Sequence, residues 1–205
     1  MSIELYGAFL LACIVLALTP GPNMSLFIAN GTAYGMRAAL LTVFGSSVGL
    51  SVLVAFATIG MTSAMTFMAE WFDIIRWVGA AYLVWLGYGR LRAALGPAAS
   101  GTAEEPRHGR YIWQGVAVSL SNPKVLLFLG AFFPQFVDTG SPLAPQLALM
   151  AVTFVLALAG VDCCLATAVG AARGWFNERR RRFADGVSGV LLLGGGLWLA
   201  VMRRS

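Results

Sequence analysis

Two long apolar stretches of this 205-residue chain are interrupted by proline near their middles. The first interruption covers residues 19–23 (TPGPN) and the second covers 121–124 (SNPK). A proline inside a helix removes one backbone hydrogen bond and clashes with the preceding turn. Hydrocarbon has no water to replace that bond, so such a break persists only where protein groups or a wet cavity supply partners. The two interruptions therefore predict broken membrane helices with a polar site between them.

The composition agrees with an all-α integral membrane protein. Hydrophobic residues make up 59% of the chain and charged residues only 11%, a balance outside the range of soluble domains. The apolar runs are long enough to cross a bilayer. Six spans are predicted, at about 5–30, 38–65, 74–95, 112–137, 143–173 and 183–202.

The chain divides into two halves around a polar linker at 96–110. Pro22 and Pro123 are 101 residues apart, so each half carries one break in its first span. Residues 1–95 and 111–205 are then two repeats of three spans each. Because three is an odd number, the repeats must cross the membrane in opposite orientations. This inverted-repeat plan, with the site at the repeat interface, is typical of secondary transporters.

The positions of the basic residues predict the orientation. Ten of the 14 lysines and arginines lie in loops on one side of the predicted spans, and three lie on the other. Basic loops face the cytoplasm. Both termini are therefore expected on the periplasmic side of a bacterial inner membrane.

Lys124 is the most costly residue to place in a membrane. It lies about 12 residues into the fourth span, roughly 18 Å from the cytoplasmic end. A lysine at that depth costs about 2.5–3.5 kcal/mol unless it is paired or hydrated. It either binds the carbonyls freed by the break or contacts a substrate carboxylate or coupling ion. The second interpretation is favoured, because charged residues inside a membrane usually serve a function.

Asp162 lies at a similar depth in the fifth span, so it could pair with Lys124 across adjacent helices. Two interpretations stay open. The pair could only neutralise two buried charges. Alternatively, the carboxylate could take up a proton or bind a substrate ammonium during transport.

Polar side chains accompany both breaks: Thr19, Asn23, Ser121 and Asn122. They could cap the broken helix ends, line a site, or do both. Half-helices that begin at the prolines would also direct partial positive charge into a cavity, which suits a carboxylate. In the second span, Gly45 and Gly49 form a G-x-x-x-G, which predicts close helix packing rather than a dedicated dimer face.

Several segments together resemble the LysE/RhtB amino-acid exporters. The ordered set consists of 18–23 (LTPGPN), 79–87 (GAAYLVWLG), 121–124 (SNPK) and 133–136 (FPQF). The resemblance covers essentially the whole chain. It maps the family's P-G-P onto Pro20, Gly21 and Pro22, and its N-P-K onto Asn122, Pro123 and Lys124. In the fifth span the relatives often place the acid one turn earlier, where this chain has Leu158 and then Asp162.

The resemblance implies an exporter of amino acids or close derivatives, driven by the proton motive force. Its site would comprise the residues of both motifs together with Asn23 and Asp162. An enzyme or redox carrier is disfavoured, because the single histidine is His108 and no C-x-x-C is present. No cofactor, metal or nucleic acid is expected, and a homo-oligomer is possible. The alternatives are a passive channel and an exporter of another small ion or metal, although metal ligands are scarce in the spans.

Overall fold

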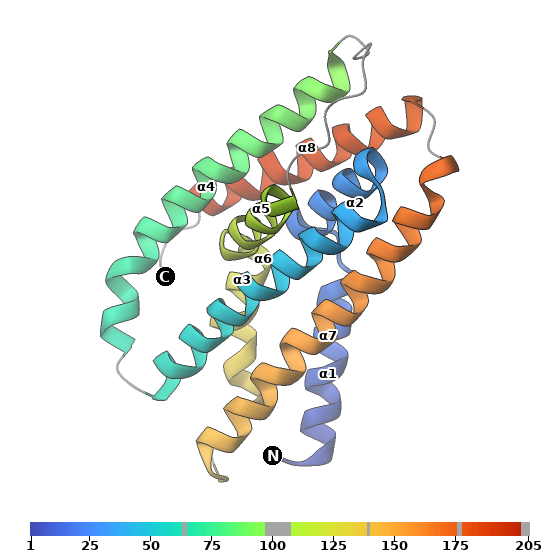
Figure 1. Ribbon diagram of the computed structural model, residues 1–205. Helices are drawn as coiled ribbons and strands as arrows, with labels where there is room; N and C mark the ends of the chain where they lie inside the picture. The colour runs from blue at the N-terminus through green and yellow to red at the C-terminus, as the bar shows by residue number, and fades with distance from the viewer. Residues whose placement is uncertain (63–64, 97–107, 139, 176–177, 202–205) are drawn as a thin grey trace.

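A computed structural model describes residues 1–62, 65–96, 108–138, 140–175 and 178–201. Within these ranges the chain is helical and contains no strand (Figure 1). Most of the predicted linker, 97–107, lies outside them. The elements are α1 (Ile3–Leu18), α2 (Pro22–Tyr34), α3 (Met36–Thr62), α4 (Met65–Leu95), α5 (His108–Leu120), α6 (Pro123–Leu127), η1 (Phe128–Phe132), η2 (Phe133–Phe136), α7 (Leu143–Ala171), η3 (Ala172–Trp175) and α8 (Glu178–Val201).

Two helices are long and apolar enough to cross a membrane on their own. They are α3, over Met36–Ile59, and α7, over its whole length. The pair α1 and α2 passes the same test if it is taken as one span bent by 49°. In the described ranges the count is therefore two or three, and six spans remain a prediction. α5 has only 13 residues, which is too short to cross alone.

The helix that contains the third predicted span is longer than expected. The hydropathy predicted a start near residue 74, whereas α4 begins at Met65. Hydropathy marks the part of a helix that lies in the bilayer, and the helical backbone can continue beyond it. The fourth predicted span is also not one helix, because α5, α6, a π-turn at η1 and the 3₁₀ segment η2 follow one another.

Both prolines named as break points begin a helix. α1 ends at Leu18 and α2 begins at Pro22, while α5 ends at Leu120 and α6 begins at Pro123. Proline suits the first helical position, because its missing N–H would have no partner there and its fixed φ is already helical. At each interruption one helix ends and the next begins at the proline. The last carbonyls of the first helix therefore lack some of their helical donors.

Glycines allow α3 and α5 to pack closely. A Cβ added at Gly45 would overlap the carbonyl of Ile112, and one at Gly49 would lie 2.7 Å from the carbonyl of Val116. From the other side, Gly115 packs against the α3 backbone near Thr42. This confirms that the G-x-x-x-G mediates helix packing, here within the chain.

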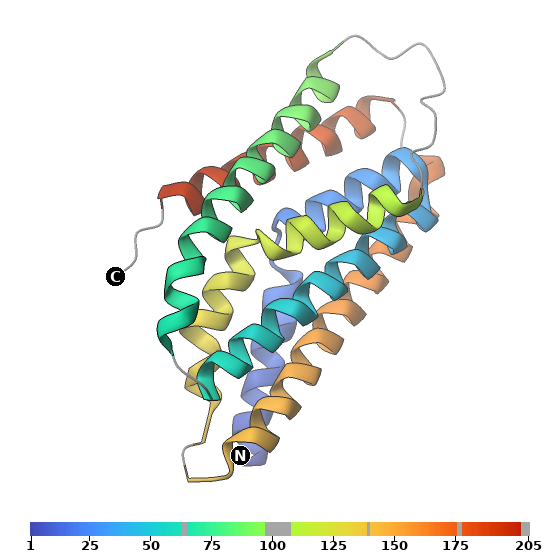
Figure 2. The ribbon, with the colours of Figure 1, turned by 60° about the vertical axis from the view of Figure 1, so that its left-hand side comes forward.

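α4 and α8 cross in the same way, with reciprocal contacts. A Cβ at Gly87 would lie 2.7 Å from Leu193, and one at Gly189 would lie 2.8 Å from Leu91. Each glycine also faces the carbonyl of the other. Both views show these two helices side by side, and Figure 2 shows the pair as a layer separate from α3 and α7.

Aromatic side chains fill the end of the bundle near the N-terminus. Phe9 of α1 is fully buried, and its ring centroid lies 5.6 Å from that of Phe133 in an edge-to-face arrangement. Phe128 stacks on Phe154 of α7 at 5.1 Å. Such pairs add to the stabilisation from buried area. The cluster closes the space between α1, η1, η2 and α7.

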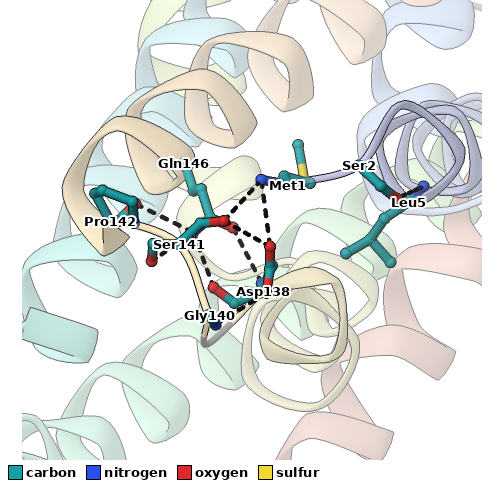
Figure 3. Close-up of polar contacts among 8 residues, drawn as sticks. All are labelled: Met1, Ser2, Leu5, Asp138, Gly140, Ser141, Pro142 and Gln146. Atoms are coloured by element: carbon teal, nitrogen blue, oxygen red, sulfur yellow. Dashed lines mark hydrogen bonds and ion pairs between the residues drawn. The ribbon is translucent and has the colours of Figure 1, made fainter.

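The loop before α7 is organised by Asp138 (Figure 3). Its carboxylate accepts hydrogen bonds from Ser141 Oγ at 2.7 Å and from the Gly140 N–H at 2.9 Å. The ammonium of Met1 lies 3.5 Å from the same carboxylate, and Gln146 Nε2 donates to the Asp138 carbonyl. These hydrogen bonds, chiefly that from Ser141, hold the pKa of Asp138 below its ordinary value.

We predict that Gly45→Ala lowers the free energy of unfolding by about 1–3 kcal/mol, because a methyl group there forces α3 and α5 apart. Gly160→Ala in α7 is the matched control, since nothing lies within 4 Å of its added Cβ. Thermal unfolding in detergent, followed by tryptophan fluorescence, compares the two variants. Equal midpoints would contradict the packing described.

We also predict that acid releases the loop around Asp138. The pKa of Asp138 is lower in the folded protein than in the unfolded chain, where it is about 4. The ionised carboxylate therefore stabilises the fold at pH values above the unfolded pKa, and this stabilisation is lost as the pH falls through the folded pKa. Hydrogen exchange of the Gly140 amide reports this loss when wild type and Asp138→Asn are compared at each pH. The variant is expected to show weak protection throughout, and a parallel pH response in both proteins would refute the assignment.

Candidate functional site

Lys124 connects the two breaks. Its Nζ donates hydrogen bonds to the carbonyl of Leu16 at 2.8 Å and to that of Thr19 at 2.7 Å. The Leu16 carbonyl lies in the last turn of α1, where it also accepts the Thr19 N–H at 3.2 Å, and Thr19 is the residue that follows the helix as its cap. An ammonium also interacts favourably with the negative end of the helix dipole. The lysine of the second break therefore caps the first break.

The first break reaches back toward the second. Asn23, which follows Pro22 as Lys124 follows Pro123, donates from Nδ2 to Ser119 Oγ of α5 at 3.5 Å. A third element touches both breaks at once, because a Cβ added at Gly195 of α8 would lie 3.1 Å from Pro22 and 3.7 Å from Pro123. Residues from α2, α6 and α8 thus meet at one place.

A small cavity lies at this junction. Its volume is about 10 Å³, which is room for roughly one water molecule. Its lining is Ala17, Asn23, Met24, Asn122, Lys124, Val125, Leu158 and Asp162. Four of the predicted site residues are in that set. Leu158 is there too, so the position where relatives often carry the acid and the position where this chain carries it face the same cavity.

The other predicted residues support the junction rather than line the cavity. Gly21 lies against the Lys124 side chain, 3.4 Å from Cε for an added Cβ. Pro22 and Pro123 begin their helices and pack under Gly195. Pro20 is exposed and lies in the turn between α1 and α2.

Two buried amide atoms at the junction have no hydrogen-bond partner among the residues that the structure describes: Asn23 Oδ1 and Asn122 Nδ2. The orientation of Asn122 is fixed, because its Oδ1 caps α6 by accepting the Lys124 backbone N–H at 3.1 Å. Most buried polar atoms in proteins are satisfied, so unpartnered ones need a reason. Together these atoms offer one acceptor and one donor to a bound molecule.

Direct pairing of Lys124 with Asp162 is not present. Both hydrogen bonds from Nζ go to carbonyls of the first break, and no ion pair joins the two residues among those that the structure describes. As expected, Lys124 binds carbonyls at a helix break. These carbonyls belong to the first break, at the end of α1, and not to the second break beside Pro123. The two charges share a cavity without neutralising each other directly.

A second polar cluster, which the sequence analysis did not predict, lies nearer the arginine-rich end of the bundle, the end that carries Arg37, Arg92 and Arg110. Arg90 of α4 forms an ion pair with Asp185 of α8 at 3.1 Å and donates to Asn30 Oδ1 of α2 at 2.5 Å. Asn30 in turn donates to Thr42 of α3 at 2.9 Å and to Gln114 of α5 at 3.4 Å. Five helices therefore meet in one hydrogen-bonded network.

Apolar helices that can cross a bilayer, with polar cavities enclosed between them, define a multi-pass membrane protein. The chain belongs to the LysE type translocator family, because the family model matches residues 14–203. It is a membrane transporter. The resemblance inferred from the sequence motifs is thereby confirmed.

Individual relatives agree with this family. A protein described as an uncharacterized membrane protein of Vibrio cholerae is 36% identical over 155 residues, which is 76% of each chain. Homoserine/homoserine lactone efflux proteins of Salmonella typhimurium and Salmonella typhi are each 29% identical over 206 residues, all of each chain. No solved structure matches the chain.

We predict that Arg90→Leu lowers the free energy of unfolding by about 3–5 kcal/mol, because Asp185 keeps its charge in a buried place and loses this partner. The double variant Arg90→Leu/Asp185→Leu should be less destabilised than either single variant, since neither charge of the pair remains in it. Denaturation of all three variants in detergent tests this ranking. A strictly additive double variant would show that the pair is not coupled.

Proposed function

We propose that this chain exports amino acids or close derivatives across the bacterial inner membrane and that the proton motive force drives the export. Homoserine and homoserine lactone are the first cargo to test, because two full-length relatives are named for their efflux. The observation that carries the proposal is the lining of the small cavity at the junction, here called the central cavity, which contains both donors and acceptors of hydrogen bonds.

The cavity suits a zwitterion. Lys124 Nζ and Asn122 Nδ2 are donors for a carboxylate, and the second of these has no partner. Asp162 and Asn23 Oδ1 are acceptors for an ammonium. The volume of about 10 Å³ holds no amino acid, so cargo must separate the lining elements as it binds. Such expansion is expected of a carrier that alternates between two conformations.

Reciprocal contacts support two inverted repeats, here taken as 1–95 and 111–205. Gly87 and Gly189 occupy matching places in the α4–α8 crossing. Asn23 and Lys124, each the residue after a break proline, reach into the opposite break. In Figure 1, α3 and α7 run in opposite directions along the bundle. These pairings fit a pseudo-two-fold axis that relates the repeats and passes through the cavity. In this arrangement the arginine-rich loops lie in the cytoplasm and both termini lie in the periplasm.

Asp162 is the residue that we propose for coupling. A partly buried carboxylate without a direct ionic partner is costly unless a proton or a cation neutralises it. A cargo ammonium and a proton would both serve, but only one can occupy the carboxylate at a time. Competition of this kind would link export of the cargo to uptake of a proton in the opposite direction.

Transport into everted membrane vesicles tests the proposal, with labelled homoserine and homoserine lactone as cargo. We predict that Asn23→Leu folds about as well as wild type, because removal of an unpartnered buried oxygen offsets the loss of the long 3.5 Å hydrogen bond to Ser119. It should nevertheless transport about tenfold to hundredfold more slowly, through loss of a hydrogen bond to a charged group of the cargo. Asp162→Asn should abolish dependence on the pH gradient.

Cys163→Ala is the matched control, since Cys163 is exposed and adjacent to Asp162 but does not line the cavity. It should transport as wild type does. Wild-type rates in both Asn23→Leu and Asp162→Asn would refute the assigned site. Flux that ignores an uncoupler in wild type would instead indicate a passive channel.

A further inference from the structure

A larger cavity lies at the arginine-rich end of the molecule, away from the junction of the breaks. Its volume is about 440 Å³, within the range of about 300–1,000 Å³ that is usual for small-molecule sites. It is bounded by α4 on one side and by α2 and α5 on the other. Asn30 and Tyr111, both buried, belong to its lining, and Arg92 and Arg110, both exposed, also belong to it.

Among the described residues, the positive charges of this cavity are not all balanced by acidic partners. Arg90 lines it as well, but that guanidinium is paired with Asp185. Arg92 and Arg110 form no ion pair with any residue in the described part of the chain. The two guanidinium groups leave an excess of positive charge beside neutral hydrogen-bonding groups such as Gln114. Arginine is well suited to bind carboxylates and other oxyanions, often through two parallel hydrogen bonds.

A row of polar side chains connects this cavity with the central one. Asn30 and Gln114, which line the large cavity, are 3.4 Å apart, and Asn23 and Ser119, one step inward, are 3.5 Å apart. The two asparagines are seven residues apart on α2, so they lie on one helix face about 10.5 Å from each other. At the other end the aromatic cluster around Phe9 closes the bundle.

We infer that the 440 Å³ cavity is a loading site that takes the carboxylate of the cargo on Arg92 and Arg110 before the cargo reaches Lys124. This inference rests on the proposed export function and extends it by a second site on the same path. Arg90, held by Asp185 and Asn30, lies between the loading site and α8. A free carboxylate and an anionic lipid headgroup offer the same chemistry to these arginines, and the experiment separates the two.

A comparison of homoserine with homoserine lactone tests whether the arginines bind the cargo carboxylate. Homoserine has a free carboxylate, whereas in the lactone the same carbon is an uncharged ring ester. In everted vesicles the arginine-rich end faces the bath, if the predicted orientation holds, so the half-saturation concentration for uptake reports loading. Arg92→Gln/Arg110→Gln should raise this concentration for homoserine about threefold to tenfold and leave it unchanged for the lactone.

Arg37→Gln is the matched control, because Arg37 is an exposed arginine at the same end of the bundle and does not line the cavity. Its half-saturation should equal that of wild type for both compounds. Arg92→Lys/Arg110→Lys, which keeps both charges, should recover most of the loss. Each variant is first compared with wild type in thermal unfolding, where the exposed substitutions are expected to leave the midpoint unchanged.

Reconstitution with and without phosphatidylglycerol distinguishes the source of the anion. A loading site predicts the homoserine-specific defect in both lipid mixtures. A defect that appears only with phosphatidylglycerol and affects both compounds equally would assign the arginines to a lipid and overturn the inference. So would unchanged half-saturation for homoserine. If wild type transports neither compound, the proposed export function fails, and the loading site fails with it.

Discussion

The structure depends on how the carbonyls at the end of α1 are satisfied inside an apolar bundle. Because the helix ends before Pro22, these carbonyls lack the full set of helical donors, and bilayer hydrocarbon would supply none. Lys124 supplies the donors from the opposite half of the chain, 108 residues from Leu16. One ammonium thereby holds the two breaks together, and Gly195 brings α8 onto both. The central cavity exists because these three elements meet without filling the space between them.

Sequence reasoning could name four residues that the structure brings to the central cavity, because those residues are conspicuous. A lysine, an aspartate and two asparagines in apolar stretches stand out, and prolines mark helix ends. The assignment of partners was harder, since Lys124 could bind Asp162 or a free carbonyl, and only the packing of α6 against the end of α1 decides between them. The family and the all-helical class could also be predicted, because motif order and hydropathy are local properties of the chain.

The second polar cluster could not be predicted in this way. Asp185 follows a run of arginines, so it resembles a solvated acid that balances nearby charge, and Arg90 resembles an arginine that only sets topology. Arg90 and Asp185 pair because α4 and α8 cross closely. That crossing depends on the contact between Gly87 and Gly189, which are far apart in the sequence. The predicted start of α4 was also wrong, because hydropathy marks only the apolar segment and the backbone stays helical beyond it.

The bonds made by Lys124 also bear on leakage. A carrier must avoid cycling its ions when no cargo is present. The Lys124 ammonium is engaged by the carbonyls of Leu16 and Thr19, so the protein itself supplies oxygens of the kind that a bound carboxylate would offer. A cargo that took over both of these hydrogen bonds would displace the carbonyls and thereby loosen the link between the halves. The contact that joins the two halves would then also be the contact that regulates access of such a cargo to the lysine.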